Sequence, residues 1–150
     1  MTAKNLSFNM IQTVIFDMDG VIVDTEPVHH FAYYQHFKEL NIEVSDEMYR
    51  SFTGNSTRNI FQKLKTQFDL QEDVEDLILS KRHLFNEAFD LKEDLYLIEA
   101  VEELIKDLHA NGIQLIVASS ASKVTINRVF TRFNLHQYFT HIVSGEDFPK

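Results

Sequence analysis

The segment Val14–Glu26 reads VIFDMDGVIVDTE, and its first residues belong to a short apolar, β-branched run, TVIF, that begins at Thr13. Such a run suits a strand that is buried on both faces, as in a parallel sheet. It leads directly into Asp17-Met18-Asp19-Gly20, a polar turn at the carboxyl end of the predicted strand. We therefore expect two carboxylates to stand at the edge of a parallel sheet.

A second buried strand is predicted at Ile113–Ala118, and it ends in the polar cluster Ser119-Ser120-Ala121-Ser122. Helices are expected at about 98–110 and 124–133, and a short third strand at Ile142–Val143. The alternation of strands and helices predicts a parallel α/β sheet, a Rossmann-like core. Because ligands bind beyond the carboxyl ends of strands in open parallel sheets, both polar clusters fall at the ligand-binding edge.

Nothing between residues 26 and 92 has the pattern of a buried strand. Apolar residues recur there at helical spacing, and Pro27 opens an aromatic-rich helical stretch. The stretches expected to be helical are about 28–40, one capped at Ser45 or Asp46, 58–68 and 73–89. We predict an all-helical insertion at 26–92, between core segments at 1–25 and 93–150.

Composition excludes several classes of function. The net charge of −9 argues against a nucleic-acid surface, because phosphate backbones demand clustered Lys and Arg. The absence of cysteine excludes disulfides, thiolate metal sites and cysteine nucleophiles, and it fits a reducing cytoplasm. No apolar run reaches the ~18 residues of a membrane span. We expect a cytoplasmic protein without nucleic-acid or membrane partners, and the sequence leaves the oligomeric state open.

The two carboxylates of the predicted turn suggest a chemistry. Asp17 and Asp19 can face one site while their charges repel, and Mg²⁺ relieves that repulsion because it prefers oxygen ligands and leaves positions for phosphate oxygens. One carboxylate can attack phosphorus while the other handles the leaving-group proton. A serine hydroxyl at the neighbouring strand end can hold a phosphate oxygen. The alternative is a plain polar turn, since Asp and Gly favour turns.

These segments resemble a known family. Val14–Glu26 looks like the first signature of the haloacid dehalogenase superfamily, in the form found in its β-phosphoglucomutase-like and sugar-phosphate phosphatase branch. Ile116–Ser120 resembles the second signature, a hydrophobic run that ends in Ser or Thr. The helical insertion after the first signature is similar to the family's cap domain. The resemblance extends from Gln12 over essentially the whole chain.

The resemblance implies roles for the residues of both signatures. Asp17 would be the nucleophile that forms an aspartyl-phosphate, and it would also ligate Mg²⁺. Asp19 would be the general acid/base toward the substrate oxygen, and its main-chain carbonyl would ligate the metal. Ser119, with Ser120 beside it, would bind the transferring phosphoryl group.

The implied activity is Mg²⁺-dependent phosphoryl transfer on small phosphorylated sugars or metabolites, by a phosphatase or a β-phosphoglucomutase-type phosphomutase. Two alternatives stay open at this point. One is a phosphoglycolate-type phosphatase, and the other is a non-catalytic protein that binds phosphorylated metabolites.

The cap contains further candidates. The segment Gly54–Asn59 resembles the family's substrate-specificity loop, so Gly54 and Arg58 are candidate substrate-binding residues. Arg58 lies one place later than the family pattern expects, and one residue on a helix is ~100° of rotation. For Arg58 the competing interpretation is a solvated helix face, and the basic group Lys81-Arg82-His83 is interpreted as such a face. His29-His30 is interpreted as a surface or hinge feature.

The resemblance also implies elements that this chain lacks. A catalytic Lys is expected after 144–147, where the usual spacing puts it just beyond Lys150; a shortened loop would make Lys150 that residue. The acidic pair that supplies the remaining metal ligands is absent. The sequence is therefore expected to be the N-terminal part of a longer protein, truncated at its C-terminus.

Overall fold

The protein is described by a computed structural model that covers residues 11–148. The chain divides into two compact units. We call residues 11–23 and 97–148 the core unit, and residues 24–96 the cap unit. The sequence places the corresponding boundaries after residues 25 and 92, whereas the structure has them after Val23 and Tyr96.

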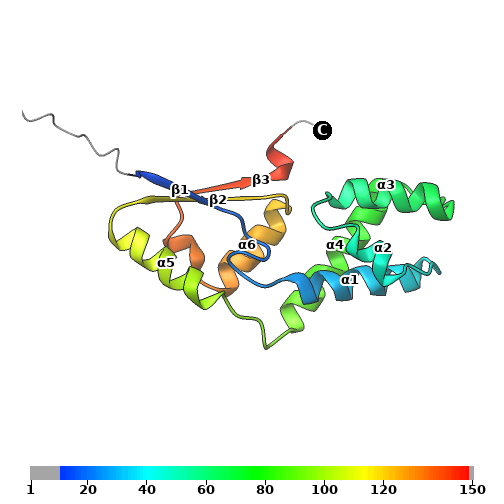
Figure 1. Ribbon diagram of the computed structural model, residues 1–150, viewed down its shortest axis with the longest axis horizontal. Helices are drawn as coiled ribbons and strands as arrows, with labels where there is room; N and C mark the ends of the chain where they lie inside the picture. Colours follow the sequence, from blue (N-terminus) through cyan, green and yellow to red (C-terminus); the bar gives the residue numbers. More distant parts are fainter. Residues whose placement is uncertain (1–10, 149–150) are drawn as a thin grey trace, which may run out of the picture. The chain divides into compact units, whose positions relative to one another are not determined.

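The core unit contains a three-stranded parallel sheet in the order β1-β2-β3 (Figure 1). Its strands are β1 (Thr13–Phe16), β2 (Gln114–Ser119) and β3 (His141–Ser144). In the register of the sheet, Phe16 lies opposite Val117, and Ser119 lies opposite Ser144. The α/β core with parallel strands that the sequence predicts is confirmed.

Two helices, α5 (Glu99–Ala110) and α6 (Lys123–Arg132), lie on one face of this sheet (Figure 1). The strand residues on the covered face include Phe16, Leu115 and Val117, which are all buried. Short 3₁₀ turns, η1 (Leu135–Gln137) and η2 (Gly145–Asp147), flank β3. Burial of this face provides the main apolar core of the unit.

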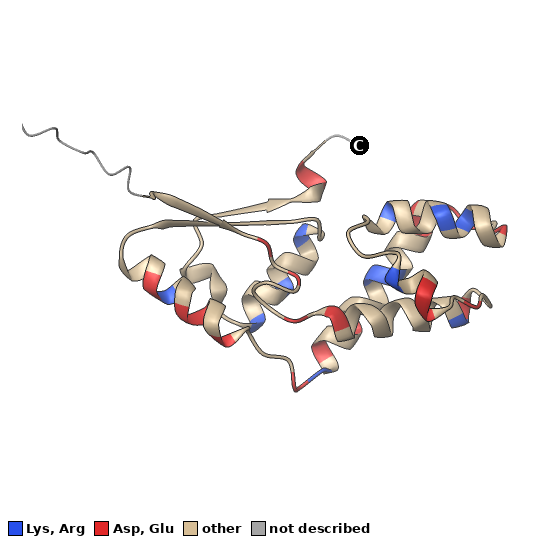
Figure 2. Ribbon diagram, viewed as in Figure 1, with Lys and Arg blue, Asp and Glu red and all other residues tan. Residues whose placement is uncertain are grey.

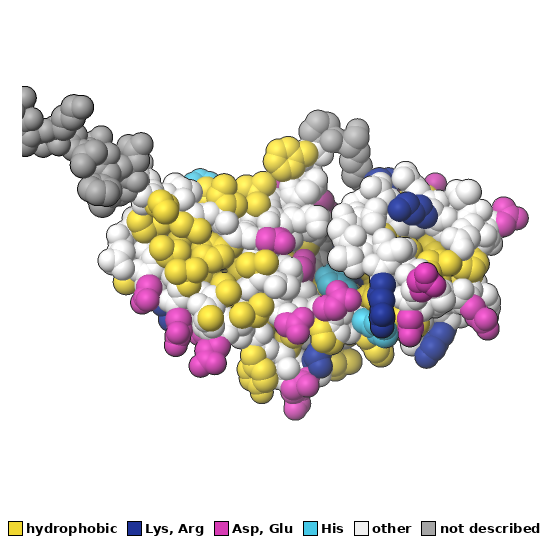
Figure 3. All heavy atoms as spheres, viewed as in Figure 1, with side chains coloured by type: hydrophobic (Ala, Val, Ile, Leu, Met, Phe, Trp, Pro, Cys, Tyr) yellow, Lys and Arg dark blue, Asp and Glu magenta, His cyan; other side chains and the backbone are white. Residues whose placement is uncertain are grey.

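The other face of the sheet is open among the described residues, and one expectation is wrong here. The sequence suggested that the first strand is buried on both faces, but Ile15 is 65% exposed and only Phe16 of β1 is buried. The reason is that β1 is an outer strand of the described sheet and that α5 and α6 pack on the opposite face. Figure 3 shows apolar side chains gathered over this strand.

The cap unit consists of four helices, which confirms the all-helical insertion. These are α1 (Glu26–Glu39), α2 (Asp46–Arg50), α3 (Thr57–Phe68) and α4 (Val74–Leu91). Three of them begin at a side chain that accepts a backbone N–H, namely Ser45, Ser56 and Asp73. Their shared core is largely aromatic and consists of Tyr33, Phe37, Val44, Phe52, Ile60, Phe61, Leu64 and Leu77. None of the helices in the described part of the chain combines the length and the apolar character needed to cross a membrane.

Candidate active site

The loop after β1 presents two carboxylates at the carboxyl edge of the sheet, where Figure 2 shows acidic residues. Met18 is completely buried, whereas Asp17 is exposed and Asp19 is half-buried. Because successive side chains in an extended segment point to opposite sides, burial of Met18 turns its two neighbours away from the core. The N–H of Met18 donates to Oδ1 of Asp17 at 2.8 Å, which orients that carboxylate.

Backbone hydrogen bonds close the same loop. The N–H of Gly20 donates to the carbonyl of Val23 at 2.8 Å, and the N–H of Ile22 donates to the carbonyl of Met18 at 2.9 Å. Gly20 has a φ of 74°, in the left-handed region where a side chain would be strained. Ile22 and Val23 are fully buried and anchor the loop to the core. The acidic pair is thus held in place by the fold itself.

The serine cluster begins at Ser119, the last residue of β2, at the same edge of the sheet. Asp17 comes one residue after the pair Phe16–Val117, and Ser119 comes two residues after it on the neighbouring strand. Ser119 is 7% exposed, and its Oγ accepts the N–H of Ala121 at 3.1 Å. The structure therefore brings Asp17, Asp19, Ser119 and Ser120 to one edge of the sheet in the core unit.

The end of β3 packs tightly against the serine cluster. Ser144 is fully buried, and its hydroxyl donates to the carbonyl of Ala121 at 2.7 Å. A Cβ at Gly145 would lie 3.2 Å from the carbonyl oxygen of Ser120, so a glycine permits this close approach. Sequence patterns gave no signal for this contact, because it depends on which strands are neighbours.

An ion pair between Lys123 and Asp147 joins the start of α6 to η2. It raises the pKa of the Lys123 ammonium and lowers the pKa of the Asp147 carboxyl. The carboxylate of Glu146 also accepts the N–H of Lys123, at 3.0 Å. Lys150, the alternative candidate for a catalytic lysine, lies outside the described residues.

The donor chemistry of the loop fits Mg²⁺. Carboxylate oxygens are the hard ligands that this ion prefers, and it commonly binds through one or two carboxylates, water and substrate phosphate oxygens. Within residues 11–148, no group of three or more His, Asp or Glu residues is placed to hold a metal ion. The loop therefore offers oxygen donors that would suit an ion whose remaining ligands are water and phosphate oxygens.

The two cap candidates lie in the cap unit. Gly54 occupies the loop between α2 and α3, with a φ of 78°. Arg58 lies in the first turn of α3 and forms an ion pair with Glu75 of α4. The Arg58 side chain is 29% exposed, so it is only partly solvated. Its positive charge is paired with the Glu75 carboxylate.

Sequence analysis missed a buried cation in the cap. Lys81 was interpreted as part of a solvated helix face, but it is only 4% exposed. Its Nζ lies 2.8 Å from Nδ1 of His29, 4.5 Å from the ring centroid of Tyr33 and 5.2 Å from that of Phe85. The helical spacing of α4 could have indicated that Lys81 is buried. Lys81 stands four residues from both Leu77 and Phe85, which lie on the apolar face of the helix.

Two tyrosines of the cap unit have raised pKa values. Burial raises the pKa of Tyr33 to about 12, although a hydrogen bond with Thr57 acts in the opposite direction. Burial and the Glu26 carboxylate raise the pKa of Tyr49, whose hydroxyl donates to Glu26 at 3.1 Å. The cap interior therefore combines the buried Lys81 side chain with the buried hydroxyl of Tyr33.

Comparison with known proteins identifies related sequences. A family model described as haloacid dehalogenase-like hydrolase matches residues 14–150. Phosphoglycolate phosphatase of Vibrio parahaemolyticus is 24% identical over 148 residues, which cover 93% of this chain and 64% of that protein. Phosphorylated carbohydrates phosphatase of Thermotoga maritima is 26% identical over 140 residues, which cover 91% of this chain and 62% of that protein.

The fold is also found among solved structures. The crystal structure of CbbY from Rhodobacter sphaeroides in complex with phosphate matches with a TM-score of 0.78 at 22% identity. The match covers 94% of this chain and 66% of CbbY. This chain thus spans 62% to 66% of the length of these three proteins.

Proposed function

Because the chain belongs to the haloacid dehalogenase-like hydrolase family, we propose that it is a Mg²⁺-dependent phosphatase of small phosphorylated sugars or related metabolites. The observation that carries the proposal is the anchored loop that presents Asp17 and Asp19 beside Ser119 at the carboxyl edge of the sheet. The names of the relatives, which include phosphatases of phosphoglycolate and of phosphorylated carbohydrates, support this substrate class.

In the proposed reaction, a carboxylate oxygen of Asp17 attacks the substrate phosphorus. The bond from phosphorus to the substrate oxygen breaks, and that oxygen takes a proton from Asp19. The product is an alcohol and an aspartyl-phosphate on Asp17. Water then gives a proton to Asp19 and attacks the same phosphorus, which releases inorganic phosphate and restores both carboxyl groups.

The other groups at the sheet edge stabilise charge in this scheme. Ser119 Oγ accepts a backbone N–H, so its own hydroxyl hydrogen is directed elsewhere and is suited to donate to a phosphoryl oxygen. Mg²⁺ held by the carboxylate of Asp17 and the main-chain carbonyl of Asp19 would supply the positive charge that offsets the repulsion between the Asp17 carboxylate and the phosphate.

Replacing the nucleophile tests the proposal. Asp17→Asn keeps the shape of the side chain but removes its attacking charge, so phosphate release should fall by at least ~10³-fold. Asp107→Asn, at an exposed position on α5, is the matched control and should retain full activity. If Asp17→Asn keeps activity within about tenfold of the unchanged protein, Asp17 is not the nucleophile.

A phosphomutase is the competing activity, and the cap contacts favour the phosphatase. A mutase must hold a bisphosphate intermediate, which requires a cation in the cap that is available to a second phosphate. Lys81 is buried against His29, and Arg58 is paired with Glu75, which a second phosphate would have to displace. Supplied with β-glucose 1-phosphate and a catalytic amount of a bisphosphate, the protein should release phosphate faster than it forms glucose 6-phosphate. The reverse ratio would establish the mutase.

A further inference from the structure

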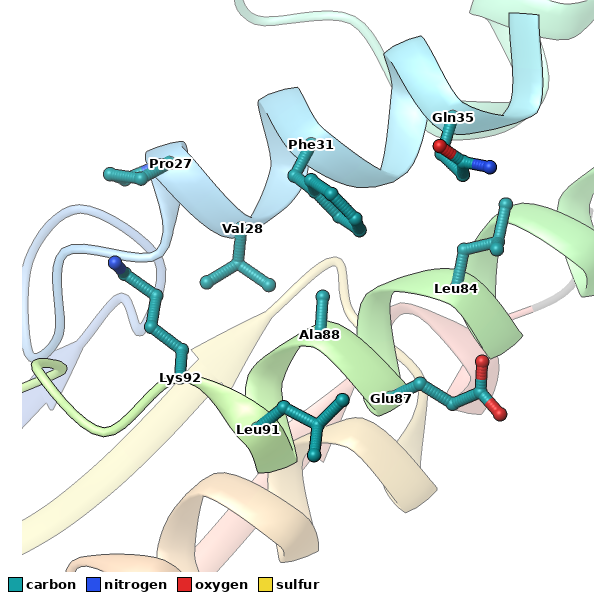
Figure 4. A pocket seen from close by; sticks show the side chains of 9 residues that line it. All are labelled: Pro27, Val28, Phe31, Gln35, Leu84, Glu87, Ala88, Leu91 and Lys92. Carbon is teal, nitrogen blue, oxygen red and sulfur yellow. The ribbon is translucent and has the colours of Figure 1, made fainter. Parts of the chain in front are cut away.

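A hollow of about 640 Å³ lies between α1 and α4 of the cap unit (Figure 4). Its apolar lining comes from both helices, which run in opposite directions, so that Pro27 lies near the end of α4. The apolar lining residues are Pro27, Val28, Phe31, Leu84, Ala88 and Leu91. We call this feature the α1/α4 groove.

The groove exposes large apolar side chains. Phe31 is 54% exposed and Leu91 is 80% exposed, whereas Val28 at the floor is 1% exposed. Scattered apolar residues on a surface are ordinary, but apolar side chains that share one groove with a polar rim mark a site of association. Covering Phe31 and Leu91 would remove a substantial apolar area from water.

The rim of the groove carries charges of opposite sign. Lys92 lies beside Pro27 at one end, and Glu87 lies toward the other end, on the side of Leu84 (Figure 4). Lys92 pairs with Asp94 at 2.8 Å, and Glu87 lies 3.2 Å from Nε2 of His83. Asp94 is 77% exposed and Glu87 is 60% exposed, so both contacts are open to solvent, where such pairs contribute little to stability and a partner's charges can compete with them.

This pattern is complementary to itself. A partner must cover an apolar strip and present a negative charge to Lys92 and a positive charge to Glu87. In a second copy of the chain, related by a twofold axis that passes between these two residues, Glu87 lies opposite Lys92 and Lys92 lies opposite Glu87 along the same strip. We propose that the α1/α4 groove is the interface of a homodimer, in which α1 and α4 of two copies form a four-helix arrangement. The proposal is independent of the phosphatase assignment, since no residue of the acidic loop takes part.

Sedimentation analysis of the 150-residue chain from about 1 to 100 μM should show a concentration-dependent dimer. Leu91→Glu should raise the dissociation constant at least ~10-fold, because it places a charge in the apolar strip. Leu79→Glu is the matched control, since Leu79 is 55% exposed on the same helix but does not line the groove. Circular dichroism should show that both variants retain their helices.

Charge exchange tests the twofold arrangement separately. Glu87→Lys and Lys92→Glu should each weaken the dimer, because each places like charges opposite one another. The double variant, with both substitutions, should restore it to within about threefold of the original dissociation constant. A monomer at all concentrations, a dimer that tolerates Leu91→Glu, or a double variant no better than the single ones would overturn the proposal.

Discussion

In the core unit, the Asp17 carboxylate lies exposed beyond the end of β1, whereas in the cap unit the Lys81 ammonium is buried among aromatic rings. Asp17 lies in the loop after β1 and Lys81 lies within α4, and the two groups have opposite surroundings. An exposed charge beside backbone donors remains available to a ligand from solution. A buried charge is already committed to its neighbours, so its first role is to determine how the helices around it pack.

The difference has an energetic basis. Transferring an isolated charge from water to an apolar interior is costly unless it is paired or hydrogen-bonded. Lys81 meets this requirement through the ring nitrogen of His29 and through the faces of Tyr33 and Phe85. Asp17 avoids the cost by staying in water, because Met18 occupies the buried position between the two acidic residues.

The largest effect is expected in the core unit, at Asp19. Asp19→Ala should reduce turnover of a sugar phosphate by ~10²–10⁴-fold, because the alcohol is a poor leaving group that needs the proton. Turnover of an aryl phosphate should fall much less, since its leaving group departs without protonation. Steady-state kinetics with both substrates measures the split. Equal losses would assign Asp19 a role in metal binding or structure, and not in proton transfer.

A smaller effect is expected in the cap, where the buried charge should matter for stability. His29→Leu removes an acceptor of Lys81 and leaves the ammonium poorly solvated, so the free energy of unfolding should fall by about 3 kcal/mol. Lys81→Met removes the charge while retaining most of the side-chain volume, and should cost less than about 1 kcal/mol. Urea unfolding of both variants makes the comparison. If Lys81→Met is the more damaging substitution, the buried charge itself stabilises the cap.

The smallest effect concerns pH. The pKa of Tyr33 is about 12 in the folded protein and about 10 in the unfolded chain. Below pH ~10 the tyrosine is protonated in both states, and its contribution to the free energy of unfolding is fully present. As the pH rises to ~12 the unfolded chain loses this proton more readily than the folded protein, so the free energy of unfolding should fall by about 2 to 3 kcal/mol.

Urea unfolding at several alkaline pH values measures this loss. Tyr33→Phe should reduce the slope without abolishing it, because the raised pKa of Tyr49 acts in the same direction. An unchanged slope would show that the hydroxyl of Tyr33 is not protected by burial.

Sequence patterns predicted the parts of the fold that depend on local periodicity. The run before Asp17 and the helical spacing of residues 58–68 and 98–110 all act over a few neighbours, and the structure has a strand and two helices there. The family assignment followed from the same short segments and is confirmed by the family model.

Features that depend on tertiary neighbours were not predicted. The exposure of Ile15 depends on which face α5 and α6 cover, and the bond from Ser144 to Ala121 depends on strand order. Lys81 was misjudged because residue type was weighted above position on the helix. The roles of Asp17, Asp19, Ser119, Gly54 and Arg58 remain predictions.

Chemical trapping of the covalent intermediate tests the central claim most directly. The protein is mixed with Mg²⁺ and a sugar phosphate and is quenched during turnover with borohydride, which reduces an acyl phosphate to an alcohol and so converts the modified aspartate to homoserine. Mass spectrometry of the peptide that contains residues 14–26 should find homoserine at position 17 only when substrate is present. Turnover that leaves Asp17 unmodified, or that modifies another residue, would contradict the assignment of Asp17 as nucleophile.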